Sequence, residues 1–292
     1  MQIAVISGKG GTGKSSISAA FATMQNEVVL ADCDVDAANL YILFNPVCDE
    51  EYVFVSGQKA VINQELCSHC GKCLEYCRFD AIAKQNGKVR ILETLCDGCQ
   101  LCSRICPVNA ITMVNEDKSR MYSGYFHKGR MVYGLLAPGE ENSGRLVSLV
   151  REKARQVAKE SGMETIIIDG PPGIGCPVIS TITGVDYVVI VTEPTVSGLH
   201  DLKRTLEMVS NFKLNVGVII NKYDLNELMA ETIDVYCTSL NICIIAKLPF
   251  DKLVVEAMVN CMSILEWAPE SVISNLLVTA YTKINDYTRT HH

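Results

Sequence analysis

The sequence predicts a doubly wound, mostly parallel α/β domain that carries a smaller inserted module. Five short apolar stretches each run into a polar or glycine-rich loop, at residues 1–7, 28–32, 165–169, 186–191 and 216–220. Strands that are apolar throughout are typical of a parallel sheet covered by helices on both faces. A block of closely spaced cysteines lies between the second and third of these stretches and marks the insertion.

The first apolar stretch leads directly into a glycine-rich loop. Residues 8–15 read Gly-Lys-Gly-Gly-Thr-Gly-Lys-Ser, which fits the phosphate-binding pattern G-x-x-x-x-G-K-[ST]. In such a P-loop the backbone N–H groups surround the phosphates, Lys14 reaches the β and γ oxygens, and the Ser15 hydroxyl binds Mg²⁺. The helix predicted over residues 16–25 adds the positive end of its dipole. The expected nucleotide-binding residues are Gly8, Gly10, Gly11, Thr12, Gly13, Lys14, Ser15 and Ser16.

Eight of the fourteen cysteines form a repeat, in which the spacing C-x2-C-x2-C-x3-C occurs at residues 67–77 and again at 96–106. This spacing matches the bacterial [4Fe–4S] run and is unlike paired zinc motifs or a disulfide scaffold. Residues 61–117 resemble a two-cluster ferredoxin, a family in which the fourth cysteine of each run ligates the other cluster. The resemblance implies one cluster on Cys67, Cys70, Cys73 and Cys106, and a second on Cys96, Cys99, Cys102 and Cys77.

The ends of the first three strands resemble those of a known ATPase superfamily. With Lys9 inside the P-loop, K-G-G-T-G-K is similar to the deviant Walker A motif of the MinD/ParA and nitrogenase iron-protein superfamily. The resemblance implies that Lys9 crosses a dimer interface to the nucleotide of the partner subunit. It also implies that Asp34 orients the attacking water, that Asp169 holds Mg²⁺ and that Gly173 senses the γ-phosphate.

Two later loops resemble the base-binding loops of the MinD-like branch. Residues 221–224, Asn-Lys-Tyr-Asp, look like the guanine-reading N-K-x-D of GTPases, but in the MinD-like branch the Asn at this place holds adenine. Residues 248–251 resemble the second base-flanking loop of that branch. The resemblance therefore implies ATP, held by Asn221 and Pro249. Asp224 has a second interpretation, as the cap of a helix that starts near Leu225.

These motifs assign residues 1–60 and 118–292 to a P-loop ATPase domain and residues 61–117 to a ferredoxin-like α+β insertion. The whole arrangement resembles MinD-superfamily ATPases with an inserted ferredoxin domain. The resemblance implies a homodimeric ATP hydrolase, slow and stimulated by a partner, with ATP, Mg²⁺ and two [4Fe–4S] clusters as cofactors. Its catalytic residues would be Lys9, Lys14, Asp34 and Asp169.

Three functions follow from this resemblance. In the first, ATP turnover is coupled to electron transfer with a redox partner, or to assembly of an iron–sulfur or other metal cofactor on a client metalloprotein. In the second, the protein is an iron–sulfur carrier or scaffold without redox coupling, although it lacks the late C-x-x-C pair of Mrp-type carriers. In the third, it is a MinD-like positioning or partner-binding ATPase. Residues 271–287 contain one basic residue, Lys283, and predict a core-packing helix rather than a basic membrane anchor.

Composition narrows the class of protein further. The formal net charge is −7, which argues against a nucleic-acid surface. No apolar run reaches the ~18–20 residues of a membrane helix, so no membrane insertion is expected. The chain starts like a strand, without a basic leader, which predicts a cytoplasmic protein whose cysteines serve metal or redox chemistry. Outside the repeat, Cys33, Cys48 and Cys176 are expected to be small buried apolar residues, and no motif defines a role for Cys176.

Overall fold

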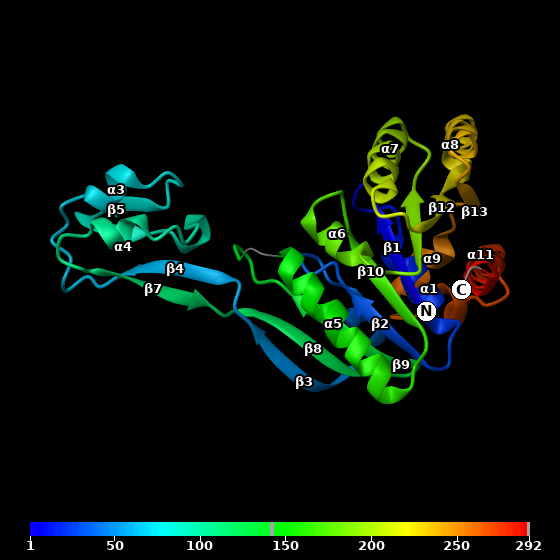
Figure 1. Ribbon diagram of the computed structural model, residues 1–292, viewed down its shortest axis with the longest axis horizontal. Helices are drawn as coiled ribbons and strands as arrows, with labels where there is room; N and C mark the ends of the chain where they lie inside the picture. The colour runs from blue at the N-terminus through cyan, green and yellow to red at the C-terminus, as the bar shows by residue number, and fades with distance from the viewer. Residues whose placement is uncertain (141–142, 291–292) are drawn as a thin grey trace. The chain divides into compact units, whose positions relative to one another are not determined.

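The computed structural model describes residues 1–140 and 143–290, which divide into two compact units (Figure 1). The sheet unit comprises Met1–Glu51, Met121–Gly134 and the chain from Ser143 onward. The cysteine unit comprises Tyr52–Arg120 and a second segment that begins at Leu135. Both ends of the predicted insertion, residues 61 and 117, lie inside the cysteine unit, because the paired strands that flank the cysteine repeat belong to it as well.

A large sheet of nine strands, counted over the described residues, has the order β13-β12-β11-β1-β10-β2-β9-β8-β3. From β13 to β9 every neighbouring pair is parallel, which confirms the predicted mostly parallel sheet. The strands are β1 (Gln2–Ser7), β2 (Val28–Asp32), β3 (Val47–Phe54), β8 (Ser119–Phe126), β9 (Gly129–Leu135), β10 (Ile166–Pro172), β11 (Tyr187–Thr192), β12 (Asn215–Asn221) and β13 (Cys243–Leu248).

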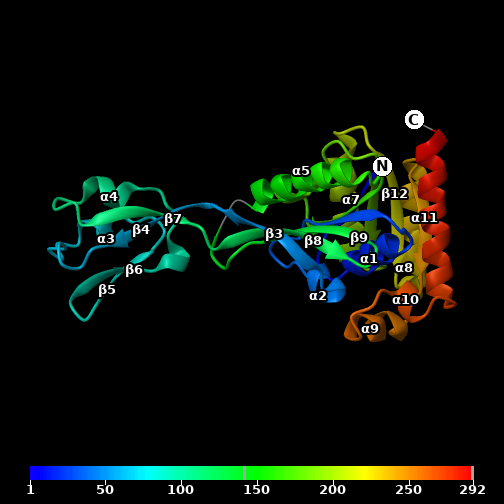
Figure 2. The ribbon, with the colours of Figure 1, turned by 90° about the horizontal axis from the view of Figure 1, so that it is seen from below.

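Helices cover both faces of this sheet. Helices α5, α6 and α7 pack over β2, β10 and β11 on one face, and α1, α10 and α11 pack together on the other (Figure 2). Over residues 1–140 and 143–290, no helix has both the length and the apolar character needed to cross a bilayer. The helices are α1 (Lys14–Thr23), α2 (Leu40–Phe44), α5 (Ser143–Ser161), α6 (Cys176–Ile182), α7 (Val196–Ser210), α8 (Glu227–Ser239), α9 (Lys252–Val259), α10 (Ile264–Trp267) and α11 (Val272–Thr290), with the 3-10 turn η2 (Tyr223–Leu225).

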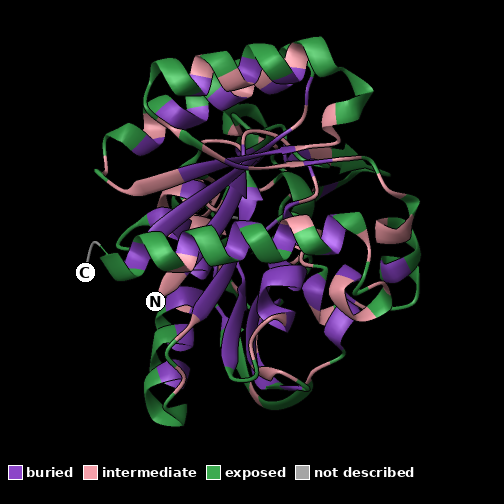
Figure 3. Cartoon of the chain, turned by 90° about the vertical axis from the view of Figure 1, so that its right-hand side faces the viewer, coloured by how far each residue is buried: buried purple, intermediate pink, exposed green. Residues whose placement is uncertain are grey.

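The central strands form the core of the sheet unit. Residues 3–6 of β1 and 188–191 of β11 are fully buried, and Figure 3 shows the buried strands between helices whose outer sides are exposed. Helix α11 buries Ile273, Leu277 and Ile284 against this core, and the ring of Tyr281 lies 5.2 Å from that of Phe21 in α1. The prediction of a core-packing helix over residues 271–287 is therefore confirmed.

The cysteine unit consists of two small antiparallel sheets and short helices. Its strands are β4 (Gly57–Ile62) with β7 (Ile111–Glu116), and β5 (Ile82–Gln85) with β6 (Lys88–Ile91). Its helices are α3 (Lys72–Tyr76) and α4 (Leu101–Ile105), with the 3-10 turn η1 (Glu93–Leu95). Its hydrophobic cluster is small, with five buried members: Ala60, Cys73, Ile82, Val89 and Ile111.

A buried polar network holds the segment after Leu135 to β4 and β7. The Lys59 ammonium pairs with Glu116 at 2.7 Å and donates to the Gly139 carbonyl at 2.9 Å. Burial opposes ionisation of Glu140, but hydrogen bonds to its carboxylate outweigh burial and lower its pKa. The donors to Glu140 are Ser56, Lys118 and Ser119. The network therefore anchors this segment within the cysteine unit.

Candidate nucleotide site and cysteine cavities

The glycine-rich loop turns between β1 and α1, at the carboxyl edge of the sheet. Gly11 and Gly13 have φ angles of +79° and +92°, which glycine adopts without strain. A Cβ on Gly13 would lie 2.5 Å from Asn221 Nδ2, whereas one on Gly10 or Gly11 would meet nothing within 4 Å. The loop is thus closed on the side of Asn221 and leaves room for a ligand beside Gly10 and Gly11.

A cavity of about 620 Å³ adjoins this loop, a volume in the range of small-molecule sites. The predicted residues that line it from the P-loop are Gly10, Gly11, Gly13, Lys14, Ser15 and Ser16. Asp34 and Asn221 line it from two other loops. The structure therefore brings together, around one cavity, residues that lie far apart in the sequence.

Six predicted residues lie near this cavity but not in its lining: Gly8, Lys9, Thr12, Asp169, Gly173 and Pro249. Gly8 packs against α7, where a Cβ would come within 2.5 Å of Asp201 Cβ. The Gly173 N–H donates to the Ser7 carbonyl at 2.8 Å, which holds the loop after β10 against β1. Leu248 takes the lining position next to Pro249.

Thr12 and Lys14 are polar residues that the fold buries beside the cavity. Their exposed fractions are 2% and 5%. The Thr12 hydroxyl has no hydrogen-bond partner in the described part of the chain. A buried polar group left unpaired costs roughly 1–3 kcal/mol. Lys14 also lines the cavity, so an anionic ligand that neutralises its ammonium fits this position.

Asp169 lies fully buried in β10, within reach of the first turns of α1. Its two oxygens accept hydrogen bonds from the Ser15 and Ser18 hydroxyls, both at 2.7 Å. Burial raises the Asp169 pKa to about 6, while the two serines and Lys14 counteract the rise. Carboxylate and hydroxyl oxygens are the ligands that Mg²⁺ prefers, so the pair Ser15 and Asp169 fits the predicted magnesium position.

A second buried carboxylate, Asp32, was missed as a functional residue. Its oxygens accept hydrogen bonds from the N–H groups of Asp34, Asn39 and Leu40, at 3.1–3.2 Å. Burial, followed by the charge of Asp169, raises the Asp32 pKa to about 8. Asp32 thus fixes the loop that carries Asp34 into the cavity. The acid at the end of an apolar strand was the signal that could have identified it.

The two predicted base loops meet each other and the P-loop. Asn221 Nδ2 donates to the Thr12 carbonyl at 2.8 Å, and Asp224 Oδ1 accepts from the Phe250 N–H at 2.7 Å. Helix α8 is capped by Asn226, so the interpretation of Asp224 as its cap is wrong. Asp224 instead ties one base loop to the other. Apolar residues that the sequence did not single out complete the cavity wall: Val254, Val255, Met258, Ile264, Ile273 and Leu277.

Lys9 points to the loop after β11. Its ammonium lies 3.6 Å from Glu193 Oε2 and 3.5 Å from the Ser197 hydroxyl. The other Glu193 oxygen pairs with Lys222 at 2.6 Å. Glu193 is a site residue that no sequence motif identified, although its place directly after an apolar strand, in Thr-Glu-Pro-Thr, was a signal.

The cysteine repeat surrounds two cavities. One is lined by Cys67, Cys70, Cys73 and Cys106, which is the first predicted cluster set. The other is lined by Cys77, Cys96, Cys99 and Cys102, the second set, and Cys73 also borders it. The chain thus gathers each predicted set of four around its own cavity, although the members of each set come from both halves of the repeat.

All fourteen cysteines are free thiols in this structure, and the six outside the repeat differ in exposure. Cys33 is buried as expected, but Cys48 and Cys176 are exposed, and Cys176 starts α6. Over residues 1–140 and 143–290, no three His, Cys, Asp or Glu side chains converge to hold a single metal ion. A four-iron cluster differs from such an ion, because each of its thiolate ligands binds a different iron.

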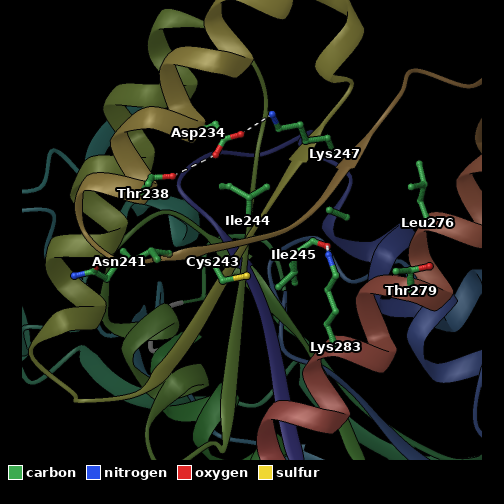
Figure 4. Close-up of a pocket in the computed structure, with 12 residues that line it drawn as sticks. Asp234, Thr238, Asn241, Cys243, Ile244, Ile245, Lys247, Leu276, Thr279 and Lys283 are labelled. Carbon is green, nitrogen blue, oxygen red and sulfur yellow. Dashed lines mark hydrogen bonds and ion pairs between the residues drawn. The ribbon is translucent and has the colours of Figure 1, made fainter.

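A further cavity, of about 660 Å³, lies at the sheet edge beside β13, between α8 and α11 (Figure 4). Asp234 pairs there with Lys247 at 2.6 Å, and Lys283 donates to the Ile245 carbonyl at 3.1 Å. The charged groups at this edge therefore already have protein partners. None of the predicted site residues lines it.

Comparisons with known proteins agree with the geometry of the sheet unit. Residues 3–264 match the CobQ/CobB/MinD/ParA nucleotide-binding domain. The uncharacterized protein MJ0578 of Methanocaldococcus jannaschii is 35% identical over 98% of this chain and 97% of its own length. The uncharacterized protein MJ0579 of the same organism is 30% identical over 91% and 92%, and the uncharacterized ATP-binding protein MJ0547 is 23% identical over 97% and 86%.

Solved structures resemble this chain in fold. MinD of Pyrococcus horikoshii, solved with Mg-ADP, has a TM-score of 0.61 at 17% identity and covers 98% of this chain and 96% of its own. The cell division ATPase MinD of Pyrococcus furiosus has a TM-score of 0.58 at 17% identity and covers 98% of both chains. At such identities the likeness shows the fold alone. It confirms the predicted P-loop fold, whereas the ferredoxin-like insertion and its clusters stay predictions.

Proposed function

We propose, because this chain belongs to the family of CobQ/CobB/MinD/ParA nucleotide-binding domains, that it is a MinD/ParA-like ATPase that binds partner proteins according to its nucleotide state. The family match supports this function better than it supports electron transfer. The observation that carries the proposal is the cavity beside the P-loop, which is lined by the buried Lys14 together with Ser15 and Asn221.

The site residues then have distinct tasks. The P-loop N–H groups and Lys14 bind the phosphates, and Asn221 and the apolar wall accept the base. Ser15 and Asp169 would hold Mg²⁺, which neutralises charge on the β and γ oxygens when it is bound. Burial raises the pKa of Asp34, and the positive charge of nearby Lys14 opposes this rise. Asp34 is our candidate for orienting the attacking water.

Titration calorimetry with Mg-ATP and Mg-GTP tests this proposal. We expect binding of Mg-ATP, much weaker binding of Mg-GTP, and loss of the magnesium dependence in Asp169→Asn. Asp186→Asn is the matched control, because Asp186 directly precedes β11 and so lies at the amino ends of the parallel strands, opposite the P-loop. Equal affinities for both nucleotides, or a magnesium dependence that survives in Asp169→Asn, would contradict the proposed site.

A second function is favoured by the two cysteine cavities, each lined by four thiols of one predicted set. They fit two [4Fe–4S] clusters, which supply one-electron transfer when bound. The protein would then couple nucleotide turnover to electron transfer with a redox partner, or to cofactor assembly on a client metalloprotein. The cavity lining supports this proposal.

An anaerobic redox titration followed by EPR separates these outcomes. The reconstituted protein is titrated without nucleotide, with Mg-ADP and with a non-hydrolysable ATP analogue. A shift of about 59 mV corresponds to a tenfold change in a one-electron equilibrium. Reciprocity then requires reduction to change nucleotide affinity by the same factor. Unchanged potentials favour a carrier or assembly role, and absence of iron after reconstitution rejects the clusters altogether.

A further inference from the structure

We propose that Glu193 is a positioning residue that holds Lys9 inside its own subunit before ATP-dependent dimerisation. The inference deepens the proposed ATPase function and rests on it, and on the homodimer and the Lys9 crossing that the sequence resemblance implies. We call this nucleotide-dependent dimerisation the nucleotide switch. In the sheet, β11 lies between β1 and β12. The loop after β11, which carries Glu193, therefore lies between the P-loop after β1 and the base loop after β12.

The Glu193 carboxylate links the P-loop to the base loop after β12. Glu193 Oε1 lies 2.6 Å from the Lys222 ammonium, and Oε2 lies 3.6 Å from that of Lys9. The Glu193 side chain is 15% exposed, against 30% for Lys222 and 34% for Lys9. Since Lys222 directly follows Asn221, the same carboxylate links the P-loop lysine to the loop proposed to accept the base.

The backbone holds Glu193 in a tight turn before α7. The Thr195 N–H donates to the Glu193 carbonyl at 2.8 Å, and the Thr195 hydroxyl caps α7 by accepting from the Gly198 N–H at 2.9 Å. A Cβ on Gly198 would come within 2.2 Å of the Glu193 carbonyl, so this turn is tightly packed. Glu193 is the less exposed partner of the ion pair, and the more exposed Lys9 side chain is the one that can move away.

Competition follows from this geometry. Two ammonium groups share one carboxylate, so removing Lys222 leaves the full negative charge of Glu193 to Lys9. Ion pairs this exposed are weak, so Glu193 biases the position of Lys9 without locking it. Phosphates of a nucleotide on a second subunit can then draw Lys9 away. The contact accordingly opposes dimerisation in the absence of nucleotide.

Amine labelling followed by mass spectrometry tests whether the Glu193 carboxylate restrains the Lys9 ammonium in the nucleotide-free protein. A lysine released from its carboxylate is more accessible to an acylating reagent and therefore reacts faster. We expect Glu193→Gln to raise Lys9 labelling roughly two- to fivefold and Lys222→Gln to lower it. Glu207→Gln, at an exposed position of α7, the helix that follows the Glu193 loop, is the matched control and leaves Lys9 unchanged. Equal Lys9 labelling in wild type and Glu193→Gln overturns the proposal.

Sedimentation with Mg-AMPPNP tests the consequence. Glu193→Gln should tighten the dimer and Lys222→Gln should weaken it, an opposition in sign that a general loss of stability would not produce. An unchanged dimer constant in Glu193→Gln also overturns the proposal. A wild-type protein that stays monomeric with Mg-AMPPNP contradicts the proposed nucleotide switch instead, and the labelling result still decides whether Glu193 holds Lys9.

Discussion

The sheet unit and the cysteine unit differ in where their cavities lie relative to the core that holds each unit together. In the sheet unit the cavity adjoins loops at the carboxyl edge, and buried helix residues such as Ile273 and Leu277 border it, whereas the central strands β1 and β11 do not. In the cysteine unit the core is small, and Cys73 belongs to it while bordering both cavities. We therefore expect the sheet unit to fold without its ligand, whereas a ligand of the cysteine unit would contribute to folding.

The largest expected effect tests the first half of this comparison. Lys14→Ala should reduce ATP turnover at least ~100-fold, because it removes a preorganised charge from the phosphates. Lys159→Ala, at an exposed position near the end of α5, is the control and should retain turnover. Iron content and visible absorption should stay the same in both variants. A parallel loss of iron in Lys14→Ala would show that the units are not independent.

The next largest effect concerns the cysteine cavities. Cys99→Ser should remove about half of the bound iron, because Cys99 belongs to one predicted cluster only. Since metal binding supplies folding free energy in small metal domains, proteolysis within residues 52–120 should become faster, while the sheet unit stays resistant. Cys176→Ser removes an exposed thiol outside the repeat and should retain all the iron. Equal iron contents in the two variants would reject the predicted ligand set.

A smaller effect is expected from the buried ion pair of the cysteine unit. Glu116→Gln leaves the Lys59 ammonium buried without its carboxylate, and breaking such a pair costs about 3–5 kcal/mol. Amide hydrogen exchange should therefore accelerate in β4 and β7 and not in β1 or β11. Glu65→Gln, at an exposed position of the same unit, is the control. Uniform acceleration in both units would mean that they unfold together.

Local motifs allowed much of the candidate site to be predicted. The P-loop needs only consecutive residues, so Gly10, Gly11, Gly13, Lys14 and Ser15 could be named before the fold was known, and the structure places all five around one cavity. The cysteine sets could be proposed because their spacing repeats and resembles a known module. The apolar strands were equally visible, since burial on both faces leaves no polar alternation.

Contacts between loops could not be predicted in this way. Glu193 meets Lys9 and Lys222 only because β11 lies between β1 and β12, an order that no local pattern contains. Asp224 was assigned to a helix cap or a base contact, and its partner, the Phe250 N–H, comes from the loop after the next strand. Polar residues at strand ends are therefore best interpreted in pairs once the strand order is known.

The smallest predicted effect is a pH response confined to the sheet unit. Burial raises the pKa values of Asp169 and Asp32 from 3.8 to about 6 and about 8. Between about pH 4 and 8 the native state therefore binds more protons than the unfolded chain, so stability falls as the pH rises. We expect the Tm of the nucleotide-free sheet unit to drop by about 2–4 °C for each kcal/mol lost, measured by calorimetry from pH 5 to 8.

Magnesium affinity should change with pH in the opposite direction to the Tm, because magnesium binding requires the ionised form of Asp169. Affinity for Mg-ADP should thus increase as the pH rises through 6, and the nucleotide should remove most of the loss in Tm. Asp32→Asn should abolish the fall in Tm above pH 6 and leave the fall below about pH 6 that is due to Asp169. A flat Tm from pH 5 to 8 without nucleotide would mean that both acids keep ordinary pKa values. In that case burial in the sheet unit would not change the ionisation of the two acids beside its nucleotide site.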